Sequence, residues 1–140
     1  MKDRLEKFRI AQQADYETAL QEILSGQKKS HWMWYIFPQI TGLGMSETAR
    51  YYAIGDIDEA KEYLQDVFLG GNLIEISKAL LKLDSNDALY VMGFPDNLKL
   101  KSSMTLFSLA KPECNVFQMV LDKFFDGEKD QRTIEILSKG

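Results

Sequence analysis

Residues 30–37 of the chain read SHWMWYIF, a stretch that holds both tryptophans and the only histidine. Most surface helices leave one face polar, but the apolar side chains of this stretch would surround a helix completely. The stretch must therefore lie at the centre of the fold. A helix with Ser30 as its cap would place His31 and Tyr35 on one face, and an extended strand would also place them on one side. Pro38 then ends any such helix.

The composition predicts one folded domain spanning residues 1–140. With 45% apolar side chains and three prolines in 140 residues, the chain can bury enough apolar surface to offset the entropy of ordering. Its formal charge of -4 has the wrong sign for a protein whose main partner is nucleic acid or an anionic membrane. We therefore expect neither disorder nor a nucleic-acid-binding function.

Cys114 is the single cysteine, which excludes an internal disulfide and a cysteine-based zinc cluster. The first residues lack the apolar core of a signal peptide, and the longest apolar run is far shorter than the roughly 20 residues of a membrane span. The acidic residues show no spacing typical of a metal or glycosidase site. We expect a cytoplasmic protein that has no membrane anchor and binds no metal, and the pattern indicates no particular cofactor.

Helical periodicity dominates the rest of the chain. Apolar residues recur at helical spacing over 3–24, with Asp3 placed to cap the start and Gly26 to end the helix. Cap residues followed by helical patterns predict further helices over 46–54, 58–69, 73–83, 86–93, 96–111, 115–125 and 130–138. No hairpin dipeptide or strict alternation appears. The sequence predicts an all-α fold, a single compact globular bundle of about seven or eight helices around the central aromatic segment.

The segment 96–110 is the second one whose apolar residues point in several directions. A strip of polar side chains lies within about a third of its circumference: Lys101, Ser102, Thr105 and Ser108. These groups need partners, because an unsatisfied buried polar group costs on the order of 1–3 kcal/mol. Either the hydroxyls bond carbonyls one turn earlier and the lysines reach solvent, or the strip lines a pocket together with His31 and Tyr35.

Residues 42–46 read GLGMS and lead into the helix predicted from Ser46. A flexible loop before a helix offers free N–H groups and the positive end of the helix dipole to an anion, and Arg50 lies one turn along. The loop lacks the third glycine of a dinucleotide fingerprint and the lysine of a phosphate-binding loop. It is an anion site or, as a structural alternative, a tight turn with Ser46 as a plain N-cap.

His31 is the only imidazole, so any histidine-dependent acid–base step must use it. It is the candidate catalytic acid or base, and the structural alternative is a core histidine with satisfied hydrogen bonds. Because no nucleophile partner is apparent in the sequence, both an enzyme and a binding protein fit the pattern.

These motifs together closely resemble a known family. The stretches SHWMWYIFPQ, GLGMS, RYYAI and DNLKLKSSMTLF stand in the order typical of the bacterial family known as domain of unknown function 1810, and the match runs from about Phe8 through FFDGEKDQRTIEIL. The resemblance implies an all-helical, cytosolic domain and supplies no reaction. Members are sometimes labelled calpastatin, but that inhibitor is a disordered, proline-rich polypeptide, whereas this composition requires a packed core. The residues that stand as the family pattern would have them are Trp34, Tyr35, Pro38, Gln39, Gly42, Gly44, Ser46, Arg50, Asp96, Lys99, Ser102, Ser103 and Thr105.

The leading hypothesis is a pocket for a small anionic ligand, nucleotide-derived in its most specific form, where the aromatic segment meets the helix beginning at Asp96. A tryptophan would stack a base, the amides of residues 44–46 with Arg50 would hold phosphate or carboxylate, and lysines would add charge. The predicted ligand-binding residues are Trp32, Trp34, Tyr35, Gln39, Gly42, Gly44, Ser46, Arg50, Lys99, Lys101, Ser102, Ser103 and Thr105. The alternative is a protein-interaction or regulatory module whose aromatics form the core or a partner-binding patch.

Overall fold

The computed structural model describes residues 3–139, in which nine helices are present. They are α1 (Glu6–Leu24), α2 (Met33–Ile36), α3 (Glu47–Tyr51), α4 (Ile57–Gln65), α5 (Val67–Leu81), α6 (Ala88–Met92), α7 (Asp96–Ala110), α8 (Val116–Phe125) and α9 (Gln131–Lys139). Within residues 3–139, extended backbone pairs only in one isolated parallel bridge, between Ile40 and Ile54. The predicted all-α fold is therefore confirmed, with one more helix than expected because the aromatic segment itself contains a helical turn.

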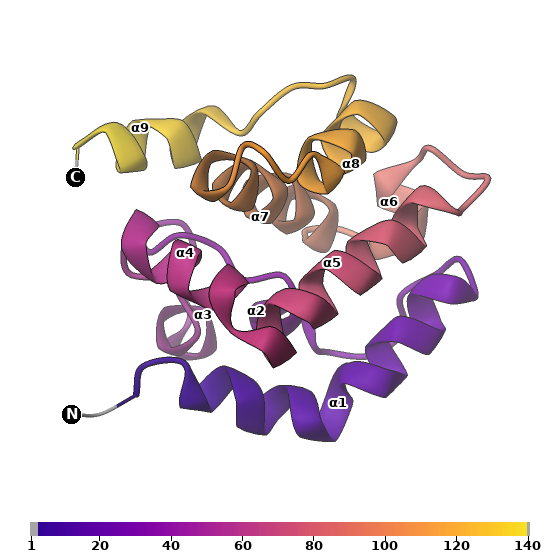
Figure 1. Ribbon diagram of the computed structural model, residues 1–140. Coiled ribbons are helices and arrows are strands. Elements are labelled where there is room, and N and C mark those ends of the chain that lie inside the picture. Colours follow the sequence, from indigo (N-terminus) through magenta and orange to yellow (C-terminus); the bar gives the residue numbers. More distant parts are fainter. Residues whose placement is uncertain (1–2, 140) are drawn as a thin grey trace.

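Helices α5 and α7 occupy the middle of the molecule (Figure 1). Helix α1 packs against α5 and α2, helices α4 and α8 each contact both α5 and α7, and α6 and α9 pack on α7. None of the helices in residues 3–139 is both long enough and apolar enough to cross a membrane.

The aromatic segment lies at the centre, as its composition predicts. Trp32, Met33, Ile36 and Phe37 are at most 2% exposed, and Trp32 and Phe37 are among the largest fully buried side chains. The helical part is a single turn, which begins only at Met33 and ends before Phe37. So short a helix satisfies few of its own carbonyls, and neighbouring elements must supply donors.

One buried amide supplies such a donor and joins four helices. Gln12 of α1 is 2% exposed. Its Nε2 donates to the Tyr35 carbonyl of α2 and to the Tyr63 hydroxyl of α4, both at 2.7 Å. Its Oε1 accepts from the Asn72 amide of α5 at 3.0 Å. The polar capacity of this side chain is therefore used within the core.

Side-chain caps begin several helices at the predicted places. Ser46 accepts from the Ala49 N–H and Asp87 from the N–H groups of Leu89 and Tyr90. The first helix begins later than predicted, at Glu6, and its N-cap is Leu5, which has no side-chain cap hydrogen bond; Asp3 lies before the helix and accepts from the Leu5 N–H at 3.0 Å. Its end agrees with the prediction, because Gly26 follows the helix with φ of +95°. The signals at Ser46 and Gly26 were sufficient because each is contained within a few residues of chain.

The boundary between α4 and α5 differs from the prediction. Asp56 rather than Asp58 caps α4, and Asp66 interrupts the expected helix 58–69 by accepting from the Leu69 N–H at 2.9 Å. The predicted boundary at residues 70–72 lies inside α5, where Gly70 is buried. A Cβ at Gly70 would lie 2.2 Å from the Leu64 carbonyl oxygen, so this glycine permits the two helices to approach closely instead of ending one.

Replacement of this glycine tests the close approach. We expect Gly70→Ala to destabilise the protein by about 2 kcal/mol or more, because the backbone of α4 must move to admit a methyl group. Gly71 is the matched control, since a Cβ there meets nothing within 4 Å. Gly71→Ala should raise the stability by up to about 1 kcal/mol through helix propensity. Urea unfolding of both variants measures the difference, and equal stabilities would contradict the proposed contact.

Candidate functional site

Glu22, near the end of α1, anchors the loop that leads to the aromatic segment. Its Oε1 accepts from the backbone N–H groups of Lys29 at 2.8 Å and Ser30 at 2.9 Å. The same oxygen accepts from the Trp32 indole at 2.9 Å, and Oε2 accepts from the Ser30 hydroxyl. Burial by itself raises the pKa of Glu22, but these hydrogen bonds together outweigh it and lower the pKa from 4.5 to about 2. The loop is therefore built around an ionised carboxylate.

The same loop is connected to the turn between α6 and α7. The backbone N–H of Lys28 donates to the Val91 carbonyl at 2.7 Å. The Lys28 side chain is 6% exposed and forms an ion pair with Asp96, the first residue of α7, at 2.9 Å. The turn between α6 and α7 contains Gly93, with φ of +79°, and a cis peptide bond before Pro95. Two segments that are distant in the sequence thus meet beside the start of α7.

A cavity of about 280 Å³ lies where these two segments meet. Its walls are formed by Lys28, Lys29, Ser30, His31, Met33, Trp34, Phe94, Pro95, Asp96 and Lys99. This is the contact between the aromatic segment and the helix beginning at Asp96 that the sequence singled out.

Positive charge dominates the cavity wall. Three lysines line it against one carboxylate, which leaves a surplus of two positive charges when His31 is neutral. The Lys99 ammonium lies 3.8 Å from Asp96 and 5.4 Å from the centre of the Trp34 ring, a cation–π geometry. The positive end of the α7 dipole lies at the same place. The arrangement can hold an anion beside an aromatic ring.

Three of the predicted site residues line this cavity: His31, Trp34 and Lys99. His31 is exposed and Trp34 is half-buried. The imidazole and the indole are therefore accessible to a ligand in the cavity.

Trp32 and Tyr35 belong to the core instead. Trp32 is 1% exposed, and the Lys28 ammonium lies 4.9 Å from the centre of its ring. The Tyr35 hydroxyl donates to Asp15 of α1; burial, followed by this hydrogen bond, raises the pKa of Tyr35. His31 precedes the helical turn, because α2 begins only at Met33, and the contact between His31 and Tyr35 is made by the His31 carbonyl, 3.4 Å from the Tyr35 hydroxyl.

The 42–46 loop has the geometry of the structural alternative. Ser46 accepts from the Ala49 N–H at 3.1 Å as a plain N-cap of α3, which is only five residues long. A Cβ at Gly44 would lie 2.5 Å from that of Ala49, and Gly42 has φ of +100°, so both positions favour glycine. The predicted residues that lie in or beside this loop and do not line the cavity are Gln39, Gly42, Gly44, Ser46 and Arg50.

The hydroxyl strip of α7 faces α9 rather than the cavity. Thr105 donates to the Lys101 carbonyl and accepts from the Asp130 N–H, both at 2.8 Å. The Ser102 hydroxyl lies 3.2 Å from the Leu98 carbonyl and 3.2 Å from the Asp130 carboxylate. The structure thus does not bring the strip and His31 into one pocket. The remaining predicted residues of α7 that do not line the cavity are Lys101, which is half-buried, and Ser103, which is buried and whose hydroxyl has no partner within residues 3–139.

Sequence reasoning missed the two lysines of the loop and the acid that pairs with one of them. Lys28 and Lys29 precede the aromatic segment directly, and this adjacency is the signal that could have identified them. Asp96 stands in the family pattern and begins a predicted helix, but the sequence assigns it no role in the site. Its pairing with Lys28 joins residues that are 68 positions apart, which no local pattern reveals.

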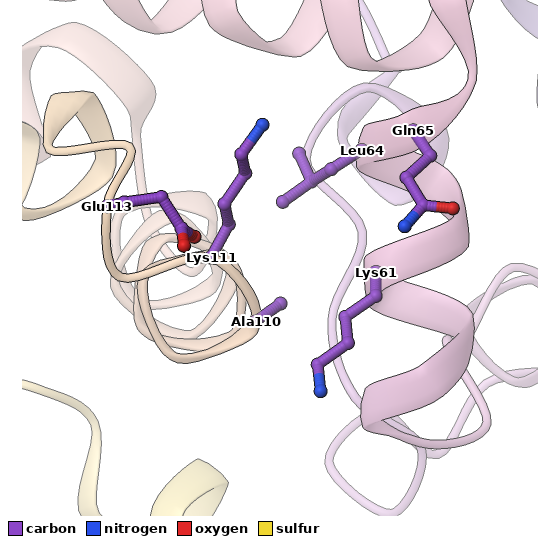
Figure 2. A pocket seen from close by; sticks show the side chains of 6 residues that line it. All are labelled: Lys61, Leu64, Gln65, Ala110, Lys111 and Glu113. Atoms are coloured by element: carbon purple, nitrogen blue, oxygen red, sulfur yellow. The ribbon is translucent and has the colours of Figure 1, made fainter.

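A second cleft lies at the opposite end of α7. Figure 2 shows Lys61 and Lys111 extending from opposite walls of this cleft, which has a volume of about 340 Å³. The other lining residues are Leu64, Gln65, Ala110 and Glu113. Because the carbonyl end of a helix repels anions and Glu113 adds a negative charge, this cleft suits an anion less well than the cavity at the N-terminal end.

A third, wider hollow of about 610 Å³ has balanced charges. It is lined by Asp3, Arg4, Glu6, Lys7, Ile10 and Tyr51, two acids and two bases among them. Residues 3–139 contain no group of three or more His, Cys, Asp or Glu side chains that could hold a metal ion. Among these three hollows, the cavity beside the start of α7 has the largest surplus of positive charge.

Comparisons with known proteins agree with this fold. The model of a family described as "Protein of unknown function (DUF1810)" matches residues 2–137. A crystal structure at 1.38 Å of the conserved hypothetical protein Rv1873 from Mycobacterium tuberculosis is similar, with 39% sequence identity, 96% of each chain covered and a TM-score of 0.94. A search among curated proteins found no match. The likeness supports the all-helical architecture and carries no reaction with it.

The Glu22 carboxylate is expected to make the stability of the folded protein depend on pH. Its pKa is depressed in the folded state, so its contribution is fully present above pH 4.5 and is lost as the pH falls toward 2. Glu22→Gln should cost about 1–2 kcal/mol at pH 7 after allowance for solvent screening. The deficit should shrink between about pH 4.5 and 2. Urea unfolding at several pH values measures it, with exposed Glu17→Gln on the same helix as the control; a deficit independent of pH would contradict the role of the charge.

Proposed function

The chain belongs to the DUF1810 family, and we propose that it is a cytoplasmic protein that binds a small anionic ligand in the cavity between the α1–α2 loop and the start of α7. The observation that carries the proposal is the surplus of lysine charge at this cavity in a chain whose formal charge is -4. Charged side chains gathered against the overall charge of a protein attract ligands of the opposite sign. The single cysteine fits a reducing compartment.

The geometry supports a ligand held by charge-assisted hydrogen bonds. Lys28 is held in place by Asp96 and by the Ser30 carbonyl, so it orients the site. Lys29 and Lys99 are more accessible and are the donors for the ligand. Lysine ammonium groups donate up to three hydrogen bonds each, which suits phosphate or carboxylate oxygens.

The size of the cavity limits the ligand. Ligand pockets usually enclose roughly 300–1,000 Å³, so a cavity of about 280 Å³ holds a small acid or one phosphate-bearing group. A nucleotide-derived ligand would therefore place its phosphate between the lysines and its base outside or along Trp34. Because Lys99 lies 5.4 Å from the centre of the Trp34 ring, a phosphate that attracts Lys99 would also free the ring for stacking.

His31 is the group that would act if proton transfer follows binding. It lines the cavity and is exposed, so it can reach an atom of a bound ligand. Imidazole is the commonest acid–base group in enzymes, since it can both donate and accept a proton near neutral pH. The proposal therefore assigns His31 to contact with the ligand and, in an enzyme, to catalysis.

A ligand titration tests the proposal. Amide and indole NMR shifts are followed during titration with simple phosphates, small carboxylates, nucleotides, ADP-ribose and nicotinamide cofactors. We expect saturable shifts at Trp34 and Lys99 with one class of compound. Lys99→Gln should weaken binding about tenfold, because a charged hydrogen bond contributes about 1.5–3 kcal/mol. Lys111→Gln at the other end of α7 is the matched control and should bind normally; silence across the panel would refute the proposal.

A second substitution tests the assignment of the histidine. His31→Ala should leave the thermal midpoint unchanged, because the side chain is exposed. It should weaken binding of the same compound about three- to tenfold, the effect of one hydrogen bond of roughly 0.5–1.5 kcal/mol. The measurement is the dissociation constant from the NMR titration. Unchanged affinity in a folded variant would remove His31 from the site and leave the lysine contacts in place.

A further inference from the structure

Four large apolar side chains are exposed within ten residues of chain, on α6, in the turn that follows it and near the start of α7, and these two helices pack together. They are Leu89 (54% exposed), Tyr90 (58%), Phe94 (74%) and Leu98 (52%), here called the 89–98 surface. Elsewhere in residues 3–139, exposed large apolar residues occur singly or in pairs along the chain, as with Val67 and Phe68. Single exposed apolar residues need no explanation, whereas a group of them marks an interaction surface.

The 89–98 surface is continuous with the basic cavity. Phe94 itself lines the cavity together with Lys29 and Lys99. The backbone N–H of Lys28 donates to the Val91 carbonyl at 2.7 Å, which holds the lysine-bearing loop against α6. Apolar side chains and lysines therefore belong to one face of the protein.

The one carboxylate that lines the cavity is already paired, because Asp96 forms an ion pair with Lys28. Asp87 and Glu22 lie beside the face and keep their negative charge, because their hydrogen-bond donors are neutral N–H and O–H groups. Within the cavity wall, Lys29 and Lys99 supply the surplus positive charge. A partner that covers the face must therefore bring apolar side chains for the 89–98 surface and carboxylates for the lysines.

We propose that the 89–98 surface docks an acidic, apolar-rich segment of a partner protein, whose carboxylates contact Lys29 and Lys99. This inference rests on the proposed function, since it uses the same lysines as the small anion. The partner segment and the small anion therefore compete for the cavity, and the anion regulates docking. Leu98 and Tyr90 contribute to docking of the partner and not to binding of the small anion, because neither lines the cavity.

A peptide-binding experiment tests this inference on the full chain. The probe is a fluorescein-labelled peptide in which leucine and phenylalanine alternate with glutamate, and fluorescence anisotropy gives the dissociation constant. We expect a value on the order of 100 μM, typical of a small transient surface. The matched peptides carry lysine in place of glutamate, or serine in place of the apolar residues, and neither should bind. Inorganic pyrophosphate should displace the acidic peptide.

Matched protein variants locate the contact. Leu98→Ser should weaken peptide binding about fivefold or more, while Val67→Ser, at a side chain that is 93% exposed on α5, should change it less than twofold. Leu98→Ser should leave pyrophosphate binding unchanged. Circular dichroism checks that both variants fold. Equal effects of the two substitutions would overturn the inference.

Other outcomes separate this inference from the proposed function. Binding of small anions without binding of the peptide would overturn docking and leave the proposed function standing. Binding of the peptide without binding of small anions would overturn the proposed function, and with it the competition and regulation inferred here, and would leave the docking contact alone. Binding only to phosphatidylserine vesicles would assign the face to a membrane and overturn the inference. Self-association that Leu98→Ser abolishes would assign it to a second copy of the chain, with the same consequence.

Discussion

The position of the aromatic segment depends on the buried amide of Gln12. The segment is apolar on every side and so must be central, but its single helical turn leaves carbonyl groups without intrahelical donors. Gln12 satisfies the Tyr35 carbonyl and is itself held by Tyr63 and Asn72, so one side chain fixes the relation of four helices. Removal of such a group leaves several buried polar atoms unpaired at once, which is more costly than the loss of one hydrogen bond.

Helix α1 holds both ends of the aromatic segment through polar side chains that it turns inward. Ten residues after Gln12, Glu22 binds the loop that precedes the segment and the Trp32 indole within it. The loop in turn carries Lys28 to Asp96 and so shapes the cavity wall. The proposed ligand site is therefore a consequence of how α1 organises the core, although no residue of α1 lines the cavity. A change at Glu22 would reach the site through the loop that its carboxylate holds.

Features that depend only on a short stretch of chain could be predicted from the sequence. The all-α class, the caps Ser46 and Asp87 and the central place of the aromatic segment follow from local chemistry and periodicity. The break at Asp66 was missed because Gly70, which resembles a helix end, serves a contact with Leu64 that only packing creates.

The different positions of the two tryptophans could not be predicted from local sequence either, because they are set by partners that lie far along the chain. Trp32 is enclosed, with its indole bound to Glu22, whereas Trp34 is half-buried beside Lys99. In fluorescence terms the protein thus carries an internal reference and a sensor. Emission from Trp32 is shielded from aqueous quenchers and follows unfolding, while emission from Trp34 is open to quenchers and to any charge that displaces the lysine above it.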